Sequence, residues 1–236
     1  EEILNRAVGY RAASNSGQTI RFTGTVSKTT ETVDINTNTN NWNLVGNPYP
    51  TYLNSQAFLA QNSSALDVNA RNIYGYRDGT RTGPGTIGTF IYINNLVNTT
   101  LNIAPGQGFI VADNSATTGD VITFNQGMRT FTGADDFILG RSNVESPMIR
   151  LKAAHNTADF ATEIYFNGNS SLGLDPGYDA ALFSGGGSNF LLYSQLVENN
   201  LGRNMAIQAL GSSDINDVII PLGLKTTQGQ QITFSL

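Results

Sequence analysis

The stretch that most restricts how this chain can fold is residues 42–50, Trp-Asn-Leu-Val-Gly-Asn-Pro-Tyr-Pro. It contains the only tryptophan and a short apolar run that suits a buried strand. Pro48 and Pro50 each lack a backbone N–H and push the preceding residue towards an extended conformation, so the strand must end here. An aromatic residue, a core strand and a rigid corner therefore follow one another directly.

Short runs of alternating apolar residues lie on both sides of this corner. Before residue 36, the apolar positions that alternate with small or polar residues are Val8, Tyr10, Ala12, Ile20, Phe22 and Val26, followed by the run 33–35. A period of two is typical of half-buried antiparallel strands. Residues 14–17, Ser-Asn-Ser-Gly, have the composition of a hairpin turn, and the polar tract 36–41 predicts an exposed loop.

One segment of the first half departs from this alternation. Between residues 51 and 66 the apolar residues do not alternate, which makes this segment the best candidate for a helix of one or two turns. Asn54 or Ser55 provides its N-cap, because a short polar side chain at that position accepts a backbone N–H of the first turn.

The strands of the first half resume after this helix. Residues 73–76 and 90–93 are expected strands, and the Gly-, Thr- and Pro-rich segment 77–88 between them contains an Asp-Gly turn signal. Residues 103–111, Ile-Ala-Pro-Gly-Gln-Gly-Phe-Ile-Val, predict a second corner, in which a Pro-Gly turn leads into an apolar strand.

The first domain is expected to close with a hairpin. Residues 121–124 and 128–131 are its predicted strands, and Asn-Gln-Gly at 125–127 is its turn. From residue 132 to residue 146 the pattern thins to a polar connector. We therefore place a domain boundary near Asn143.

Seven short apolar runs follow this boundary, separated by turn residues. They are residues 148–153, 162–166, 180–183, 191–196, 205–210, 218–222 and 231–236. Their spacing suits a sandwich or jelly roll and is too short for strand–helix–strand crossovers. The fold class we predict is all-β, with two antiparallel β-sandwich or jelly-roll-like domains, 1–143 and 144–236, and at most one short helix. The last run reaches Leu236 without a turn, so we expect the second domain to be truncated.

Composition limits the classes of function. Only 13% of the residues are charged and the net charge is −5, whereas about a quarter of residues are charged in an average protein. Phosphate binding needs a clustered basic face, and the Lys and Arg residues are scattered, so we expect no nucleic-acid partner. No apolar run approaches the roughly 20 residues that cross a bilayer, so we expect no membrane insertion. Cysteine is absent, and the sequence starts at Glu1, as in a mature or excised fragment.

Three stretches carry a resemblance to a known group of proteins. They are residues 42–54, beginning with the tryptophan corner and ending in Tyr-Leu-Asn; residues 103–111; and residues 173–180, Gly-Leu-Asp-Pro-Gly-Tyr-Asp-Ala. Together and in this order they resemble a non-catalytic region near the C-termini of large secreted proteins of Bacteroidetes. Those proteins are cargo of the type IX secretion system and include surface adhesins and polysaccharide-degrading enzymes. The resemblance implies an extracellular or cell-surface location and contact with the secretion machinery through a C-terminal sorting domain absent here.

Aromatic residues near loops suggest a carbohydrate-binding surface. The candidates are Trp42, Tyr49, Tyr52, Tyr74 and Tyr76. Sugar faces stack on aromatic rings, and the neighbouring amides of Asn43 and Asn47 would bond to sugar hydroxyls. The alternative is that the tryptophan fills the core and the tyrosines are ordinary strand residues.

Several Asp residues and the single His could bind a metal ion or take part in catalysis, but each also has a structural interpretation. Asp175 and Asp179 would hold Ca²⁺ together with backbone carbonyls, or would cap backbone amides in a turn. Asp135 and Asp136 are adjacent and would face opposite ways in a strand, so we interpret them as connector residues. His155 is the only histidine, which disfavours zinc. No Gly-Xaa-Ser-Xaa-Gly elbow accompanies it, and we interpret it as a solvated loop residue.

These observations favour a protein without catalytic residues. The function we predict is a structural or adhesion module of a secreted protein that positions upstream domains near its attachment to the cell surface. The alternative is a carbohydrate-binding module that serves a secreted glycoside hydrolase and contacts a polysaccharide or another surface component. An autonomous hydrolase is the weakest of the three hypotheses, and apart from Ca²⁺ we predict no cofactor.

Overall fold

The computed structural model describes residues 3–11, 23–36, 41–77, 89–133, 146–155, 158–183 and 189–236. The chain divides into two compact units. Unit 1 comprises Glu1–Asp67 and Asn72–Ser142, and unit 2 comprises Val68–Arg71 and Asn143–Leu236. The segment Val68–Arg71 thus belongs to unit 2, in contrast to the division expected from the sequence, and the N–H of Ala181 donates to the carbonyl of Asn69 at 3.1 Å. The predicted turns at 14–17 and 78–79, the expected strand residues Ala12, Ile20 and Phe22, Asp135, Asp136 and Asn143 lie outside the described residues.

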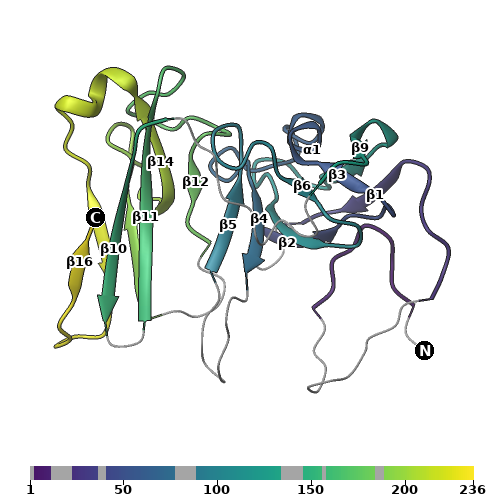
Figure 1. The fold of residues 1–236 in the computed structure, drawn as a ribbon, viewed down its shortest axis with the longest axis horizontal. Coiled ribbons are helices and arrows are strands. Elements are labelled where there is room, and N and C mark those ends of the chain that lie inside the picture. The colour runs from purple at the N-terminus through teal and green to yellow at the C-terminus, as the bar shows by residue number, and fades with distance from the viewer. Residues whose placement is uncertain are drawn as a thin grey trace. The chain divides into compact units, whose positions relative to one another are not determined.

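Unit 1 is built from short strands and one α-helix among its described residues (Figure 1). Its elements are β1 (Glu31–Asp34), β2 (Trp42–Gly46), β3 (Tyr52–Asn54), α1 (Ser55–Gln61), β4 (Ile73–Arg77), β5 (Thr89–Ile93), β6 (Asn102–Ile103), β7 (Gly108–Ala112), β8 (Val121–Phe124), the 3₁₀ turn η1 (Gln126–Met128) and β9 (Arg129–Thr130).

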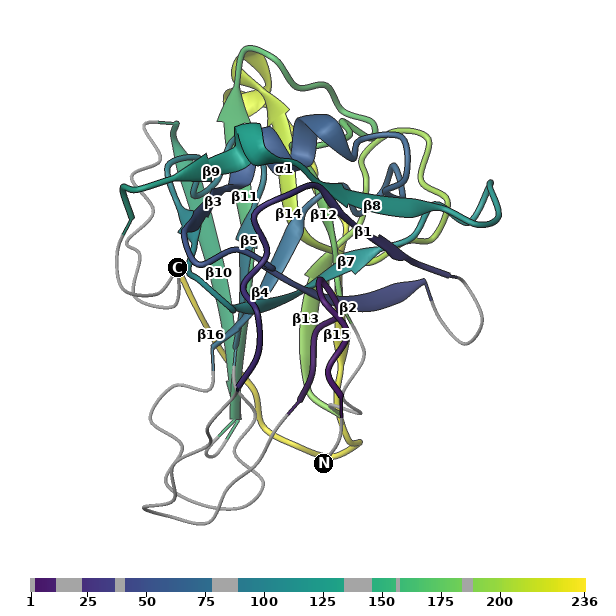
Figure 2. The same cartoon turned by 90° about the vertical axis from the view of Figure 1, so that its right-hand side faces the viewer.

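These strands form three sheets. One has four strands in the order β2-β7-β4-β5, one has three in the order β6-β3-β9, and one is the pair β1-β8. All of their pairings are antiparallel. Figure 2 shows β1 running alongside β8. The three sheets and α1 enclose one apolar core, in which Phe58 of α1 contacts Phe109 and Phe124 with ring centroids 5.1 and 5.3 Å apart.

The helix confirms the expectation for residues 51–66. It spans Ser55–Gln61, and its two large apolar residues, Phe58 and Leu59, are buried. Asn54 is the N-cap: its side-chain oxygen accepts the N–H of Ala57 at 2.8 Å. The apolar residues of this segment do not alternate because they must fall on one side of a helix.

Replacing Asn54 by Ala should lower the free energy of unfolding by about 1 kcal/mol, since one N–H of the first helical turn loses its acceptor. Urea denaturation followed by circular dichroism measures this loss. Asn54→Ser is the control and should lose less, because serine is also a favourable N-cap. Equal losses in the two variants would contradict a role for the cap.

The predicted hairpin of residues 121–131 is wrong. β8 pairs with β1 and β9 pairs with β3, so the two strands belong to different sheets. Asn125 caps η1 by accepting the N–H of Gly127, and the 3₁₀ turn directs the chain out of one sheet and into another. The Asn-Gln-Gly signal indicates a turn correctly, but a turn does not specify which strands pair on either side of it.

Unit 2 is organised around one large sheet. Its elements are β10 (Met148–His155), β11 (Ala158–Asn167), β12 (Ala180–Ala181), β13 (Leu191–Ser194), β14 (Met205–Gly211), the 3₁₀ turn η3 (Ser212–Asn216), β15 (Leu222–Lys225) and β16 (Thr233–Ser235). The strand order is β15-β13-β14-β11-β10-β16, and β12 also pairs with β14. Figure 1 shows β16 beside β10 at one edge of this sheet.

The sheet of unit 2 differs from the sequence prediction in two respects. β11 and β14 pair in parallel, with Ile164 opposite Gln208, although all strands were expected to be antiparallel. The strand expected at 218–222 is displaced towards the C-terminus and becomes β15. Pro221 lacks a backbone N–H, which explains why the strand begins only after it.

The all-β, sandwich-like fold class is confirmed. The described residues are mostly strands and turns, with one α-helix. None of the described helices is long and apolar enough to cross a membrane.

Candidate functional site

One face of the four-stranded sheet of unit 1 gathers aromatic residues. Tyr74 lies directly opposite Tyr92, and Tyr76 directly opposite Phe90, in the pairing of β4 with β5. Side chains alternate along a strand. These four residues therefore share the face opposite Ile73 and Ile93, which are buried in the core.

Trp42 extends this aromatic face across the sheet. Its ring lies edge-on to that of Tyr74, with centroids 4.8 Å apart, and Tyr74 lies edge-on to Tyr92 at 5.2 Å. The rings of Tyr76 and Phe90 are 5.3 Å apart. Tyr74 is 0% exposed and Tyr76 is 41% exposed, so the ring most accessible to a ligand is that of Tyr76. The sequence analysis did not single out Phe90 and Tyr92, because the sequence of neither strand specifies the register in which β4 pairs with β5.

Two of the predicted sugar-binding residues do not belong to this face. Tyr49 is 2% exposed, and its hydroxyl donates to the carbonyls of Phe124 at 2.8 Å and Thr29 at 3.0 Å. Burial raises its pKa above the usual value. Tyr52 lies on β3, in another sheet, and its ring packs so closely on Gly133 that a side chain there would collide with it. Neither Tyr49 nor Tyr52 therefore joins the aromatic face of β4 and β5.

Replacing Tyr49 by Phe should lower the free energy of unfolding by about 1 to 2 kcal/mol, because the buried carbonyl of Phe124 loses a hydrogen-bond donor. The thermal midpoint and urea denaturation measure the effect. Tyr76→Phe is the matched control: its side chain is exposed, so its stability should change by less than about 0.5 kcal/mol. A loss as large in the control as in Tyr49→Phe would contradict this assignment.

The two amides expected to bind sugar hydroxyls are bonded to backbone instead. Asn47 is 4% exposed, and its side-chain N–H groups donate to the carbonyls of Thr51, Ile103 and Ala104. Its side-chain oxygen accepts the N–H of Tyr49 at 3.0 Å. Asn47 thus ties the first corner of the chain to the second. Both N–H groups of this amide are therefore used within the fold.

Asn43 is likewise bonded to backbone. Its amide donates to the carbonyls of Asn36 and Asn41, and its oxygen accepts the N–H of Asn36. The side chains of Asn43 and Asn47 thus stabilise loops, whereas the sequence suggested contact with sugar hydroxyls.

Asp175 and Asp179 form the amide-capping turn that was one of the two alternatives. The carboxylate of Asp179 accepts the N–H groups of Asp175 and Ala209, both at 2.7 Å. The carboxylate of Asp175 accepts the N–H of Ser171 at 2.6 Å. Asp179 is 1% exposed, and burial outweighs these hydrogen bonds, raising its pKa to about 7. The hydrogen bond from Ala209 connects this turn to β14.

The described residues contain no group of three or more His, Asp or Glu side chains that could hold a metal ion. Asp113 is a second buried carboxylate, 2% exposed, whose pKa is raised by burial and then by the charges of Asp120 and Asp67. The Ca²⁺ predicted at Asp175 and Asp179 would compete with backbone amides for the same carboxylate oxygens.

His155 is not the solvated loop residue expected from the sequence. It is the last residue of β10, is half-buried, and lies opposite Ala158 in the hairpin of β10 and β11. Its Nδ1 is 3.1 Å from the carbonyl of Gln231, and its ring centroid is 6.4 Å from that of Phe190. The histidine is therefore a strand residue whose ring lies near Gln231 and Phe190.

Comparison with known proteins places the chain in one family. The family described as "Domain of unknown function (DUF8693)" matches residues 6–236, which is nearly the whole chain. The chain belongs to the DUF8693 family. It matches no curated protein and no solved structure.

Proposed function

We propose that this DUF8693 domain is a non-catalytic structural module of an exported protein, which positions neighbouring domains near the point of attachment to the cell surface. The observation that supports this proposal most directly is the bonding of Asn47. A side chain in the most distinctive motif of the chain is consumed by four hydrogen bonds to backbone. A buried amide whose N–H groups are all bonded to backbone stiffens a corner of the fold.

The same arrangement recurs in other loops. Asn62 joins α1 to β8, since its oxygen accepts the N–H of Thr123 at 2.8 Å and its amide donates to the carbonyl of Thr123 at 3.0 Å. The oxygen of Asn94 accepts the N–H groups of Leu96 and Val97. Turns fixed in this way make the unit that contains them resist deformation, which suits a structural module.

Location at the cell surface, export by the type IX system and contact with its machinery through a further domain are parts of the same proposal. They are supported by the resemblance of residues 42–54, 103–111 and 173–180 and by the low share of charged residues. A surface rich in amides and hydroxyls remains soluble without a strong net charge.

The test is to replace this domain in its parent protein with a flexible Gly/Ser linker of equal span. We expect the parent protein to be exported and its upstream domain to keep its activity, while adhesion or surface positioning is lost. Unchanged adhesion with the flexible linker would overturn the proposal. Substrate turnover by the isolated domain would overturn it as well.

A second candidate function is carbohydrate binding at the aromatic face, favoured by the exposure of Tyr76 beside Phe90. A ring at the surface that is supported by another ring offers a flat apolar area to a sugar. Affinity electrophoresis against soluble polysaccharides tests this function. Tyr76→Ala should abolish retardation, whereas Tyr10→Ala, which removes a tyrosine of similar exposure at another site, should not.

A further inference from the structure

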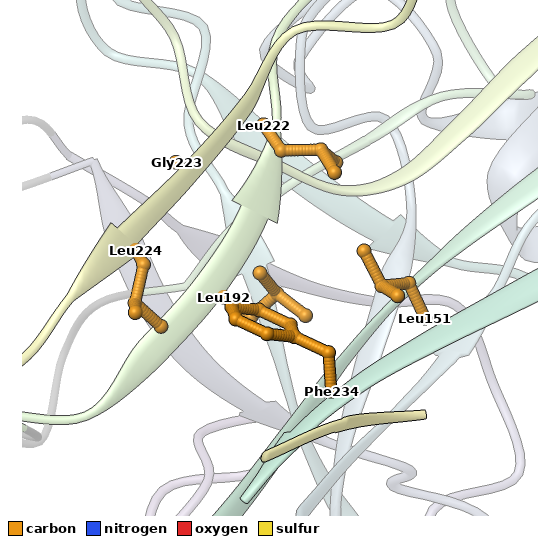
Figure 3. A pocket seen from close by; sticks show the side chains of 6 residues that line it. All are labelled: Leu151, Leu192, Leu222, Gly223, Leu224 and Phe234. Atoms are coloured by element: carbon orange, nitrogen blue, oxygen red, sulfur yellow. The ribbon is translucent and has the colours of Figure 1, made fainter. Parts of the chain in front are cut away.

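A hollow of about 380 Å³ opens in unit 2 between the two ends of its sheet (Figure 3). The residues that line it are Leu151, Leu192, Leu222, Gly223, Leu224 and Phe234. They come from β10, β13, β15 and β16. Since β15 and β16 are the first and last strands of the sheet order, the sheet curls until both of its edges border the same space.

Both of these edges lack a strand partner within the described residues. β15 pairs only with β13, and β16 pairs only with β10. An edge strand presents a row of backbone N–H and C=O groups along its free side. The hollow therefore combines free backbone groups with an apolar surface, which are the two elements of recognition by β-strand addition.

The exposure of the apolar side chains increases from the base of the hollow to its rim. Leu192 is 1% exposed, whereas Leu222 is 49% and Phe234 is 53% exposed. Leu222 and Leu224 are two residues apart on β15, so they point to the same side of the strand. A strand laid along β15 places every second side chain against them.

Charge restricts the occupant further. Lys225 is the only charged residue of β15 and β16. It is exposed and forms no ion pair within the described part of the chain. In contrast, Lys152 on β10 is paired with Asp159. An unpaired cation at the end of the free edge favours an acidic residue at the adjacent end of the incoming strand.

We propose that the hollow is a docking site for an extended peptide strand with apolar residues at alternate positions and an acidic terminal residue. The strand pairs with the free edge of β15. Its apolar side chains fill the space between Leu222, Leu224 and Phe234, and its acidic residue meets Lys225. The backbone pairing supplies affinity, and the hollow selects the side chains.

The experiment uses the whole chain and a fluorescein-labelled peptide of about eight residues, the length of an ordinary strand. The peptide alternates valine with threonine and carries glutamate at both ends. A glutamate then lies near Lys225 whether the peptide pairs parallel or antiparallel to β15. Fluorescence anisotropy should rise and saturate. A matched peptide with a central proline keeps the apolar content but interrupts backbone pairing, and it should not bind.

Point variants test whether the peptide binds at the hollow. Leu222→Glu and Phe234→Glu should each weaken binding by about tenfold or more, because each places a carboxylate on the apolar surface. Both side chains are about half exposed, so the fold should persist, and unchanged thermal midpoints verify this. Leu201→Glu is the control: it adds the same charge at a side chain that is 84% exposed and does not line the hollow, and binding should be unchanged.

A charge exchange tests the role of Lys225. Lys225→Glu should weaken binding several-fold at low salt, and a peptide with lysine at both ends should restore it. Absence of saturable binding, or equal binding of the proline peptide, would overturn the proposal. In the second case the hollow would accept apolar groups without strand pairing. An unchanged affinity for Leu222→Glu and Phe234→Glu would also overturn it.

Discussion

Asn47→Asp should lower the free energy of unfolding by about 3 to 5 kcal/mol, although aspartate has nearly the same shape as asparagine. In the native protein the side-chain N–H groups of Asn47 donate to the carbonyls of Thr51, Ile103 and Ala104 at 2.8, 3.2 and 3.0 Å. A carboxylate would present lone pairs to these three oxygens in a site that is 4% exposed. Only the bond from the N–H of Tyr49 would survive.

Urea denaturation measures this loss, and Asn43→Asp is its matched control. Asn43 also donates to two backbone carbonyls, but it is half-buried, so water can replace the lost bonds. The control should lose about 1 kcal/mol or less. Equal losses for the two variants would show that burial of the amide does not fix the corner.

Asp179→Ala should lower the free energy of unfolding by about 2 to 4 kcal/mol, because the N–H groups of Asp175 and Ala209 lose a buried acceptor. Asp175→Ala is the control. It removes a carboxylate that is more exposed and caps only the same turn, so a smaller loss is expected.

The pH dependence of stability provides a second measure of Asp179. Its pKa is raised to about 7 from an ordinary value near 3.8. Between these values the folded state binds a proton that the unfolded state releases. Protonation of Asp179 therefore stabilises the folded state fully below about pH 4. This stabilisation is lost as the pH rises to about 7, and the free energy of unfolding falls by at most about 1.4 kcal/mol per pH unit.

Asp179→Asn removes this titration. The difference in unfolding free energy between the wild type and Asp179→Asn should shift against the wild type as the pH rises from 4 to 7, and should be constant above that range. A difference that does not change with pH would show that the carboxylate titrates in the same way in both states.

The sequence alone determined the local elements of this DUF8693 domain. Pro48 was correctly expected to end the strand before it, because its missing N–H and its effect on the preceding residue act locally. The sequence limited the N-cap of α1 to Asn54 or Ser55, because an N-cap depends only on residues within one turn, and Asn54 is the cap. The all-β class followed from the same local signals.

Tertiary structure decided which strands pair and which side chains meet. The partners of β8 and β9, the parallel pairing of β11 with β14 and the contact of His155 with Gln231 all depend on residues far apart in the chain. The same holds for candidate sites: Trp42 and Tyr74 meet across the sheet, whereas Tyr49 turns into the core. Propensity and capping act over a few residues, but register and burial are set by the free energy of the whole packed unit, which no short stretch encodes.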